Sequence, residues 1–282
     1  MKKLLIIPTL LLCLLLCACQ SSSKEDYTSQ LKLNISHINE SDEDKIISIS
    51  YPIFGGIDDK ETITIINSSI SNYVTSEYDA FQDALTVKEQ NILSNTEEIL
   101  SSQVEAPSYQ EEAEESEETT ESTDEVSVED STKESDSSNE PITLNMSFKI
   151  TYNKNNYLCI VQSYDKDLGE GKDFSGQRSF FFSLENASYL SLGEIFVFDE
   201  SFTNYINSEI NKQLESGAYT TYDDNSGFTG ISKNSKFYID SNKLYIYYDA
   251  LEISPDKDVI PTFAFDLSDV KKYTNEDFAN IF

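Results

Sequence analysis

The chain has 282 residues, with 51 Asp and Glu against 20 Lys and Arg, so its formal net charge is −31. This charge excludes nucleic acid as a partner, because binding to a phosphate backbone requires a cationic surface that releases counterions. The length suits one large domain or two small ones with a hydrophobic core.

The first 18 residues have the pattern of a secretory signal peptide. Two lysines precede an apolar run from Leu4 to Leu16, which is shorter than the span of about 20 residues that a transmembrane helix needs. The segment Leu16-Cys17-Ala18-Cys19 resembles a bacterial lipobox. That resemblance implies cleavage after residue 18 and a lipid on Cys19, the only membrane attachment that we expect, with residues 19–26 as a polar tether.

The four cysteines predict a fold without disulfides. Cys13 and Cys17 leave with the signal and Cys19 carries the lipid, so Cys159 has no partner. Its segment, Tyr157–Val161, is apolar, which predicts a buried and unreactive thiol.

The first folded segment combines a strand with a long helix. Alternating apolar residues in 47–51 predict a strand that ends at Pro52, and Gly55-Gly56 predicts a turn. Apolar residues at helical spacing from Ile63 to Leu85 then predict an amphipathic helix that continues toward Leu100.

A tract from about Gln103 to Glu140 consists largely of Glu, Asp, Ser and Thr. It lacks the apolar surface that would offset the entropy cost of ordering, so we predict that this acidic tract is a disordered insertion. We interpret it as a solvated, self-repelling loop. A calcium-binding segment and an electrostatic lure for a cationic ligand remain as alternatives.

Beyond the acidic tract the apolar residues recur with a period of two. Residues Ile142–Tyr152 predict a half-buried strand, Asn153–Asn156 predict a turn, and Tyr157–Tyr164 return as the second strand of a hairpin. The acidic tract is therefore expected between the long helix and the hairpin that covers it.

A second unit repeats the combination of strands and a helix. Alternation in 180–184 predicts its first strand, and Ser201 is predicted to cap a helix that stops at Gly217. Both halves carry the pattern Ile-Asn-Ser-x-Ile on a predicted helix, at Ile66–Ile70 and Ile206–Ile210. Three further strands are predicted at Phe237–Ile239, Leu244–Tyr248 and Thr262–Leu267.

These elements predict an α+β fold of two subdomains, each an amphipathic helix packed on an antiparallel sheet, with a disordered acidic insertion. The N-terminal module is expected over residues 27–171, with the insertion at about 103–140, and the C-terminal module over residues 172–282.

The order of these pieces resembles a pair of extracytoplasmic modules of unknown function. They form the ectodomain of the anti-sigma factor RsiV, which senses lysozyme, and similar modules precede the catalytic domain of some peptidoglycan deacetylases. In the first module the resemblance rests on Tyr51-Pro52, Gly55-Gly56 and Ile66-Asn67 through the hairpin. In the second module it rests on Leu190–Phe196, Ile206-Asn207, Phe237–Ile239, Leu244–Tyr248, Ile253–Pro255 and Phe263–Phe265.

The chain also departs from that family. Family members often carry a Gly-Ala-His-Pro-like segment before the second module, whereas Gly169–Gly176 contains no His-Pro here, and the acidic insertion is unusual. We find neither a sigma-binding region nor a deacetylase domain, so neither of those activities is carried over.

Few residues could carry catalysis, and we predict no catalytic residue, metal site or cofactor. His37 is the only histidine, so it cannot form a zinc site with one buried Cys159, and we interpret it as a partly exposed strand residue rather than a catalytic base. Asp165–Asp167 and Asp223–Asn225 do not continue the calcium-loop pattern and are interpreted as polar turns. Gly169–Gly171 lacks the helix that a phosphate loop needs.

Other residues suggest binding instead. Arg178, the only arginine, is expected to pair with a carboxylate at a strand start. Five tyrosines could form an exposed aromatic binding surface, although packing of their rings in the core is the favoured interpretation. They are Tyr219, Tyr222, Tyr245, Tyr247 and Tyr248.

We therefore expect a lipid-anchored protein on the extracytoplasmic face of a Gram-positive cell membrane, with no enzymatic activity. It would act as a binding or sensing module of the envelope, for a cationic protein such as lysozyme or for wall material. Two alternatives are a carboxylate-dependent cell-wall hydrolase, because carboxylates are abundant, and an accessory subunit of a membrane complex.

The lipid can be tested directly. Cys19→Ala should abolish metabolic labelling of the chain with palmitate in the producing cell, because Cys19 is the predicted acylation site. A variant that still incorporates palmitate would contradict the lipobox prediction.

Overall fold

The computed structural model describes residues 25–102, 140–169, 173–222 and 227–282. The predicted signal peptide, Cys19 and the acidic tract up to residue 139 lie outside the described residues, as does most of the tether. Within the described part, no helix is both long and apolar enough to cross a membrane.

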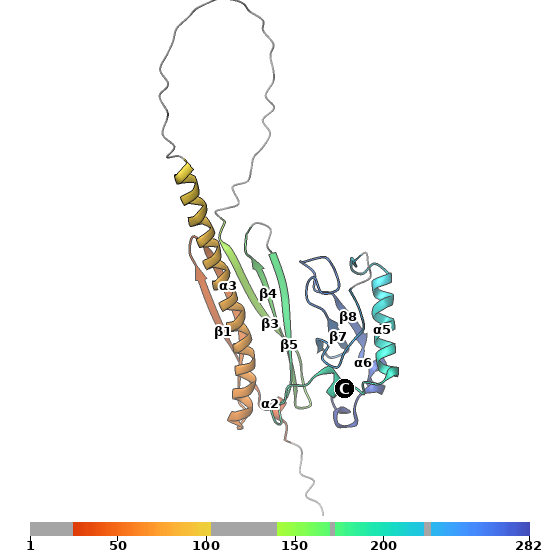
Figure 1. The fold of residues 1–282 in the computed structure, drawn as a ribbon. Coiled ribbons are helices and arrows are strands. Elements are labelled where there is room, and N and C mark those ends of the chain that lie inside the picture. Colours follow the sequence, from red (N-terminus) through yellow and green to blue (C-terminus); the bar gives the residue numbers. More distant parts are fainter. Residues whose placement is uncertain (1–24, 103–139, 170–172, 223–226) are drawn as a thin grey trace, which may run out of the picture.

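Five strands form the larger sheet, in the spatial order β1-β2-β3-β4-β5. Helix α3 (Lys60–Ser102) connects β2 to β3 and covers one face of the sheet (Figure 1). Because the chain crosses over through a helix, β2 and β3 run parallel, while the other neighbouring strands are antiparallel. The strands are β1 (Lys32–Ser41), β2 (Lys45–Gly55), β3 (Ile142–Lys154), β4 (Tyr157–Asp167) and β5 (Asp173–Ser183), and a short helix α2 (Tyr27–Gln30) precedes them.

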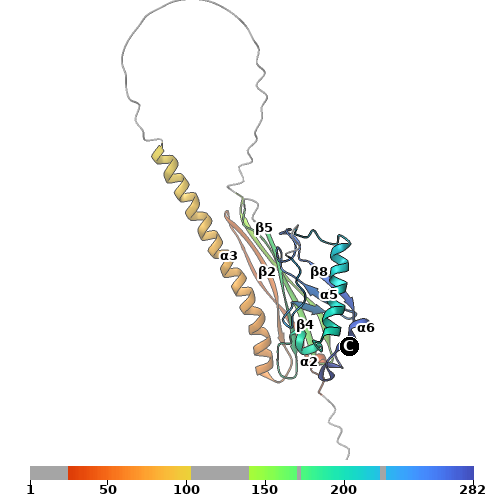
Figure 2. The same ribbon diagram turned by 45° about the vertical axis from the view of Figure 1, so that its right-hand side comes forward.

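The rest of the chain packs on the opposite side of this sheet from α3 (Figure 2). It holds a three-stranded antiparallel sheet, in the order β6-β7-β8, and helix α5 (Glu200–Glu215). The fold is thus α+β, as predicted, but the larger sheet is mixed rather than antiparallel, because α3 carries the chain back so that β3 starts at the same end as β2. The remaining elements are α4 (Leu192–Ile195), β6 (Phe237–Ile239), β7 (Lys243–Tyr247), β8 (Thr262–Asp266), α6 (Leu267–Val270), η2 (Lys271–Tyr273) and η3 (Glu276–Phe278).

Strands β4 and β5 contribute to two separate cores because their side chains alternate between the faces of the sheet. Leu158, Ile160 and Phe180 pack toward α3. Cys159 and Phe181 point the other way and pack with the C-terminal strands. The larger sheet is therefore the middle layer between α3 and the C-terminal unit.

Two strand predictions are wrong in their details. Strand β2 does not end at Pro52 but continues to Gly55. A proline is tolerated there because β3 pairs with β2 only as far as Ile49, so Pro52 has one neighbouring strand rather than two. The strand predicted at 180–184 does not open the second unit; as β5 it is the edge strand of the first sheet, paired with β4.

The two long helices follow their apolar spacing. Helix α3 buries one stripe of side chains, including Ile66, Ile70 and Phe81. Helix α5 ends before Gly217, whose φ of +81° suits a glycine, as predicted. Its N-cap is Asp199 rather than Ser201, because the Asp199 carboxylate accepts a hydrogen bond from the main-chain N–H of Phe202 at 2.9 Å.

The repeated Ile-Asn-Ser-x-Ile pattern has the same structural role in both helices. Asn67 of α3 bonds both main-chain groups of Phe54, at 2.8 and 2.9 Å. Asn207 of α5 accepts from the N–H of Ile231 at 2.9 Å. In each case the asparagine ties a neighbouring segment of main chain to the helix, which satisfies backbone groups near the core.

The β3–β4 turn holds the N-terminal segment through Asn156. This residue is 5% exposed and has a φ of 66°, and its side-chain oxygen accepts from the N–H of Tyr27 at 2.8 Å and that of Thr28 at 3.4 Å. Its side-chain nitrogen donates to the main-chain oxygen of Glu25 at 2.7 Å and to the Glu185 carboxylate at 3.2 Å. Asn156 therefore joins three parts of the chain.

Asn156→Gly should lower the free energy of unfolding by about 1–3 kcal/mol, because glycine keeps the positive φ but loses these hydrogen bonds. Asn155→Gly is the matched control, since Asn155 also has a positive φ but makes an exposed hydrogen bond to Asn280. Urea unfolding of both variants should show a clearly smaller loss for Asn155→Gly. Equal losses would contradict the role assigned to Asn156.

Candidate functional site

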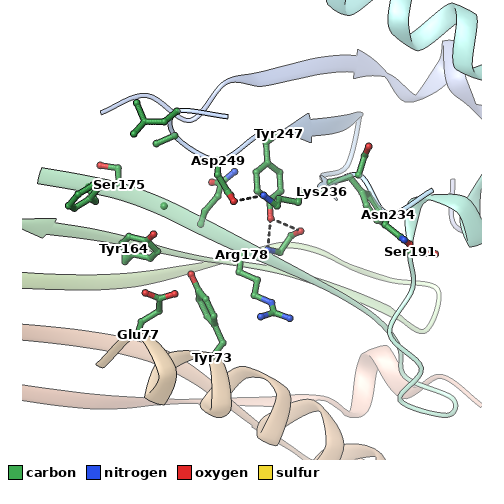
Figure 3. Close-up of a pocket in the computed structure, with 18 of the residues that line it drawn as sticks. Tyr73, Glu77, Tyr164, Ser175, Arg178, Ser191, Asn234, Lys236, Tyr247 and Asp249 are labelled. Atoms are coloured by element: carbon green, nitrogen blue, oxygen red, sulfur yellow. Dashed lines mark hydrogen bonds and ion pairs between the residues drawn. The ribbon is translucent and has the colours of Figure 1, made fainter. Parts of the chain in front are cut away.

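The candidate site is a cleft of 490 Å³ along the outer edge of β5, between α3 and the C-terminal unit. We refer to it as the β5 cleft (Figure 3). Its volume lies within the range of about 300–1,000 Å³ that is usual for ligand sites. The lining side chains come from three parts of the fold: Tyr73 and Glu77 of α3, residues 174–179 of β5, and Lys236, Tyr247, Asp249 and Leu251 of the C-terminal unit.

At Ser179, two tyrosine hydroxyls take the place of a neighbouring strand and bond the main-chain groups on the outer edge of β5. The Tyr247 hydroxyl accepts from the main-chain N–H of Ser179 at 2.9 Å, and the Tyr189 hydroxyl donates to the Ser179 C=O at 3.2 Å. Tyr247 belongs to β7 and Tyr189 to the segment that follows β5 (Figure 3 shows the contact of Tyr247). These contacts satisfy both outward main-chain groups at the inner end of the cleft.

The floor of the cleft depends on a glycine. Tyr164 of β4 is the register partner of Gly176 in β5, and a Cβ atom at Gly176 would lie 2.2 Å from the Tyr164 ring. Only a glycine therefore allows the ring to lie across the edge strand.

The charges around the cleft are mostly paired. Glu77 of α3 forms an ion pair of 2.5 Å with Lys166, and Lys236 pairs with Asp249 and, at 3.2 Å, with Glu252. Burial by itself would lower the pKa of Lys236, but hydrogen bonds to Asp249 and Glu252 and their negative charges together outweigh it and raise that pKa. Lys236 therefore stays protonated at neutral pH, and its two carboxylate partners give this side of the cleft a net negative charge.

Arg178 pairs with no carboxylate of the described residues, whereas the sequence predicted such a pair. Its guanidinium lies over the rings of Tyr73 and Phe180, at 5.5 and 5.4 Å from their centroids, and none of the ion pairs between described residues includes it. The reason is its register in β5, which turns the side chain toward α3 and its aromatic residues. Such cation–π contacts hold the side chain against α3 at the cleft.

The tyrosines of the cleft remain neutral. Burial raises the pKa of Tyr164 and of Tyr247 to about 12, and burial together with the nearby Glu77 carboxylate raises the pKa of Tyr73 further. At physiological pH all three therefore present hydroxyl groups rather than phenolates. Those hydroxyls can donate or accept hydrogen bonds but supply no base.

Three large apolar side chains at the cleft are unusually exposed. Phe174, Tyr189 and Leu251 are 39%, 51% and 46% exposed, and each comes from a different segment of the chain. Apolar side chains that gather around a polar groove are typical of a surface that another molecule covers.

The predicted site residues are mostly elsewhere. His37 is exposed on β1, and Cys159 is fully buried, with burial raising its thiol pKa to about 11, as expected for an unreactive cysteine. Of the five tyrosines, only Tyr247 lines the cleft. Tyr219 bonds the edge strand β8 through both main-chain groups of Thr262, and Tyr222 bonds the C=O of Leu251. Packing of the rings in the core with hydroxyls facing water was the favoured interpretation; the hydroxyls of Tyr219, Tyr222 and Tyr247 instead bond main chain.

The described residues contain no cluster of three His, Cys, Asp or Glu side chains that could hold a metal ion. Asp165–Asp167 is not a turn, contrary to the prediction, but the end of strand β4, where it pairs with β5. Asp165 accepts from the Ser175 hydroxyl across the strand pair and Asp167 from the Gly169 N–H, both at 2.7 Å. Asp223–Asn225 and the rest of Gly169–Gly171 lie outside the described residues.

Sequence reasoning missed Tyr73, Tyr189 and the 174–178 stretch of β5. Tyr73 looked like an ordinary core residue of an amphipathic helix, and nothing local marks Tyr189. The one available signal was Gly176, because an isolated glycine in a strand often marks a close approach of another group.

The architecture is a helix-covered mixed sheet with a second small sheet on its other face, and a solved structure shares this fold. A member of the DUF3298 family from Bacteroides fragilis matches with a TM-score of 0.55 and 12% identity over 87% of this chain and 94% of that chain. A DUF3298 family protein from Pseudomonas aeruginosa matches with a TM-score of 0.46 and 10% identity over 88% and 95%. At such identities the first likeness establishes the fold alone, and the second carries no argument. No protein-family model and no curated protein matches the sequence.

The hydroxyl of Tyr247 provides a test of the cleft geometry. Tyr247→Phe should lower the free energy of unfolding by about 1–3 kcal/mol and speed amide exchange at Ser179, because a buried N–H loses its acceptor. Tyr222→Phe is the control, since its hydroxyl bonds main chain at an exposed position, and it should change stability by less than about 0.5 kcal/mol. Unchanged exchange at Ser179 in Tyr247→Phe would show that the contact is not maintained in solution.

Proposed function

We propose that this chain is a non-catalytic binding or sensing module of the bacterial cell envelope, held at the outer face of the membrane by a lipid on Cys19. The β5 cleft is its ligand site. One observation carries the proposal: three exposed apolar side chains, from three segments, surround a groove whose carboxylates and lysine are already ion-paired. Such a groove is suited to hold a partner rather than to transfer protons.

A cationic protein such as lysozyme is the ligand that we favour. The chain has a net charge of −31, so it attracts basic proteins over a distance that falls with ionic strength. The sequence resembles the module pair of RsiV, which senses lysozyme, and its structural neighbours include DUF3298 proteins, a family of unknown function. Wall material is the second ligand class, because the proposed lipid places the module beside it.

A carboxylate-dependent hydrolase receives less support. Glycosidases use two carboxyl groups, one of which must hold a proton to donate. In the β5 cleft, Glu77 and Asp249 each form an ion pair with a lysine, so neither carboxylate is left free to face a sugar ring. Turnover of purified wall fragments by the protein would favour the hydrolase instead.

An accessory role in a membrane complex is compatible with the same cleft, since a membrane partner could occupy it. Crosslinking in cells would separate this possibility from a soluble ligand.

Binding to immobilised lysozyme and to purified peptidoglycan across a salt series tests the proposal. We expect retention of lysozyme at low ionic strength that weakens as salt increases. Leu251→Ser should weaken this binding about tenfold, because it removes an apolar side chain at the cleft. Val197→Ser is the matched control, since Val197 is 43% exposed but does not line the cleft.

Two results would contradict this proposal. If the protein binds neither lysozyme nor peptidoglycan at low ionic strength, both ligand classes are excluded. An equal effect of Leu251→Ser and Val197→Ser would show that the β5 cleft is not the site.

A further inference from the structure

We propose that the β5 cleft binds an extended, basic peptide segment of a partner protein, which adds to the larger sheet as a sixth strand along β5. This inference rests on the proposed function, because it takes the β5 cleft as the ligand site and specifies how the ligand is held.

The main-chain groups of β5 that face the cleft can be identified from their neighbours. Three main-chain groups of β5 bond to groups outside the sheet: the Ser179 N–H, the Phe181 C=O and the Ser183 N–H. The odd-numbered residues of β5 therefore point their main-chain groups toward the outer edge of the sheet. Along a strand, the main-chain N–H and C=O groups of successive residues point alternately to one edge and to the other. Ser175 and Gln177 therefore also direct an N–H and a C=O outward, and no hydrogen bond between described residues uses those groups.

The chain covers this edge only in part. Beyond Ser179, residues 188–190 return beside β5 and bond Ser183 and Phe181. At Ser179 the two tyrosine hydroxyls end the pairing. From Phe174 to Arg178 the edge has no lysine or proline of the kind that often blocks strand addition, and its one charged side chain, Arg178, is turned toward α3. A stretch of about five residues is thus left open.

The cleft provides space and surfaces on both sides of an added strand. Side chains of a sixth strand would alternate between the two faces of the sheet. One row would meet Tyr73 and Phe174 on the α3 side, and the other would meet Leu251 and Asp249 of the C-terminal unit. The side-chain nitrogen of Gln177, which lines the cleft, is buried and has no hydrogen-bond partner among the described residues.

Charge favours a basic occupant. Four carboxylates and three bases lie in the cleft or pair with its residues, and Lys236 alone faces two carboxylates. The carboxylates are Glu77, Asp165, Asp249 and Glu252, and the bases are Lys166, Arg178 and Lys236. The chain's own acidic tract, residues 103–140, is not a suitable occupant of the cleft, because it carries the same sign of charge and is poor in strand-forming residues.

The test uses the full chain and an acetylated heptapeptide of alternating lysine and valine. We expect the peptide to bind and to slow the exchange of the Ser175 and Gln177 amide hydrogens, measured by hydrogen-exchange NMR. A fully N-methylated analogue keeps the side chains and the charge but has no main-chain donor, so it should not bind. A peptide of alternating glutamate and valine should bind at least about tenfold more weakly.

A variant pair tests the edge itself. Gln177→Pro removes an outward N–H and should weaken binding of the lysine–valine peptide about tenfold, whereas Gln177→Ala keeps the main chain and should weaken it less. Proline is tolerated where the N–H faces outward, and circular dichroism would verify folding. Should Gln177→Pro fail to fold, the N-methylated peptide on the unchanged chain still decides the question.

The outcomes separate the two proposals. Retention of lysozyme without any protection of Ser175 and Gln177 by the peptide would overturn strand addition and leave the proposed function standing. Equal binding of the N-methylated peptide would also overturn it. If neither lysozyme, peptidoglycan nor the peptide binds, both proposals fail.

Discussion

The alternation of side chains along β4 and β5 is the constraint on which the rest of the structure depends. Leu158 and Phe180 face α3, while Cys159 and Phe181 face the C-terminal unit. Both sets are almost completely buried, so a slip of one residue in the β4–β5 register would exchange the two cores. The sheet thus has covering layers on both faces, and its β5 edge, between those layers, is where a cleft can form.

Tyrosine hydroxyls complete this arrangement at the strand edges. Tyr219 bonds both main-chain groups of Thr262 at the start of β8, and Tyr247 with Tyr189 does the same at Ser179 of β5. A tyrosine can bury its ring in a core and still satisfy a main-chain group at the rim. On β8 the hydroxyl bonds the first residue of the strand. On β5 the two hydroxyls bond a residue in the middle of the strand, so the main-chain groups of the 174–178 stretch are left without a neighbouring strand.

The patterned elements could be predicted from the sequence because each depends on near neighbours. The period of two over Ile142–Ile150 and the apolar stripe of α3 were confirmed, and the predicted turn is present but spans only Asn155-Asn156. A β-bulge between Ile150 and Tyr152 places Tyr152 on the opposite face of the sheet, in the core of the C-terminal unit. Predictions that depended on a distant partner were wrong. The 180–184 strand carried the right alternation, but nothing in it specified that it would pair with β4. Among the described residues, Arg178 lies over Tyr73 of α3 and Phe180 of β5 rather than beside a carboxylate.

The sequence by itself determined the acidic charge, the α+β class, the order of helices and strands, and the burial of Cys159, since these follow from composition and local periodicity. Only the tertiary structure decided the site. Tyr73, Gly176, Tyr189 and Leu251 lie far apart in the chain and share no motif, and they meet because β5 is an edge strand between two packed layers. Edge position is a property of the whole sheet, so no local pattern could have revealed it.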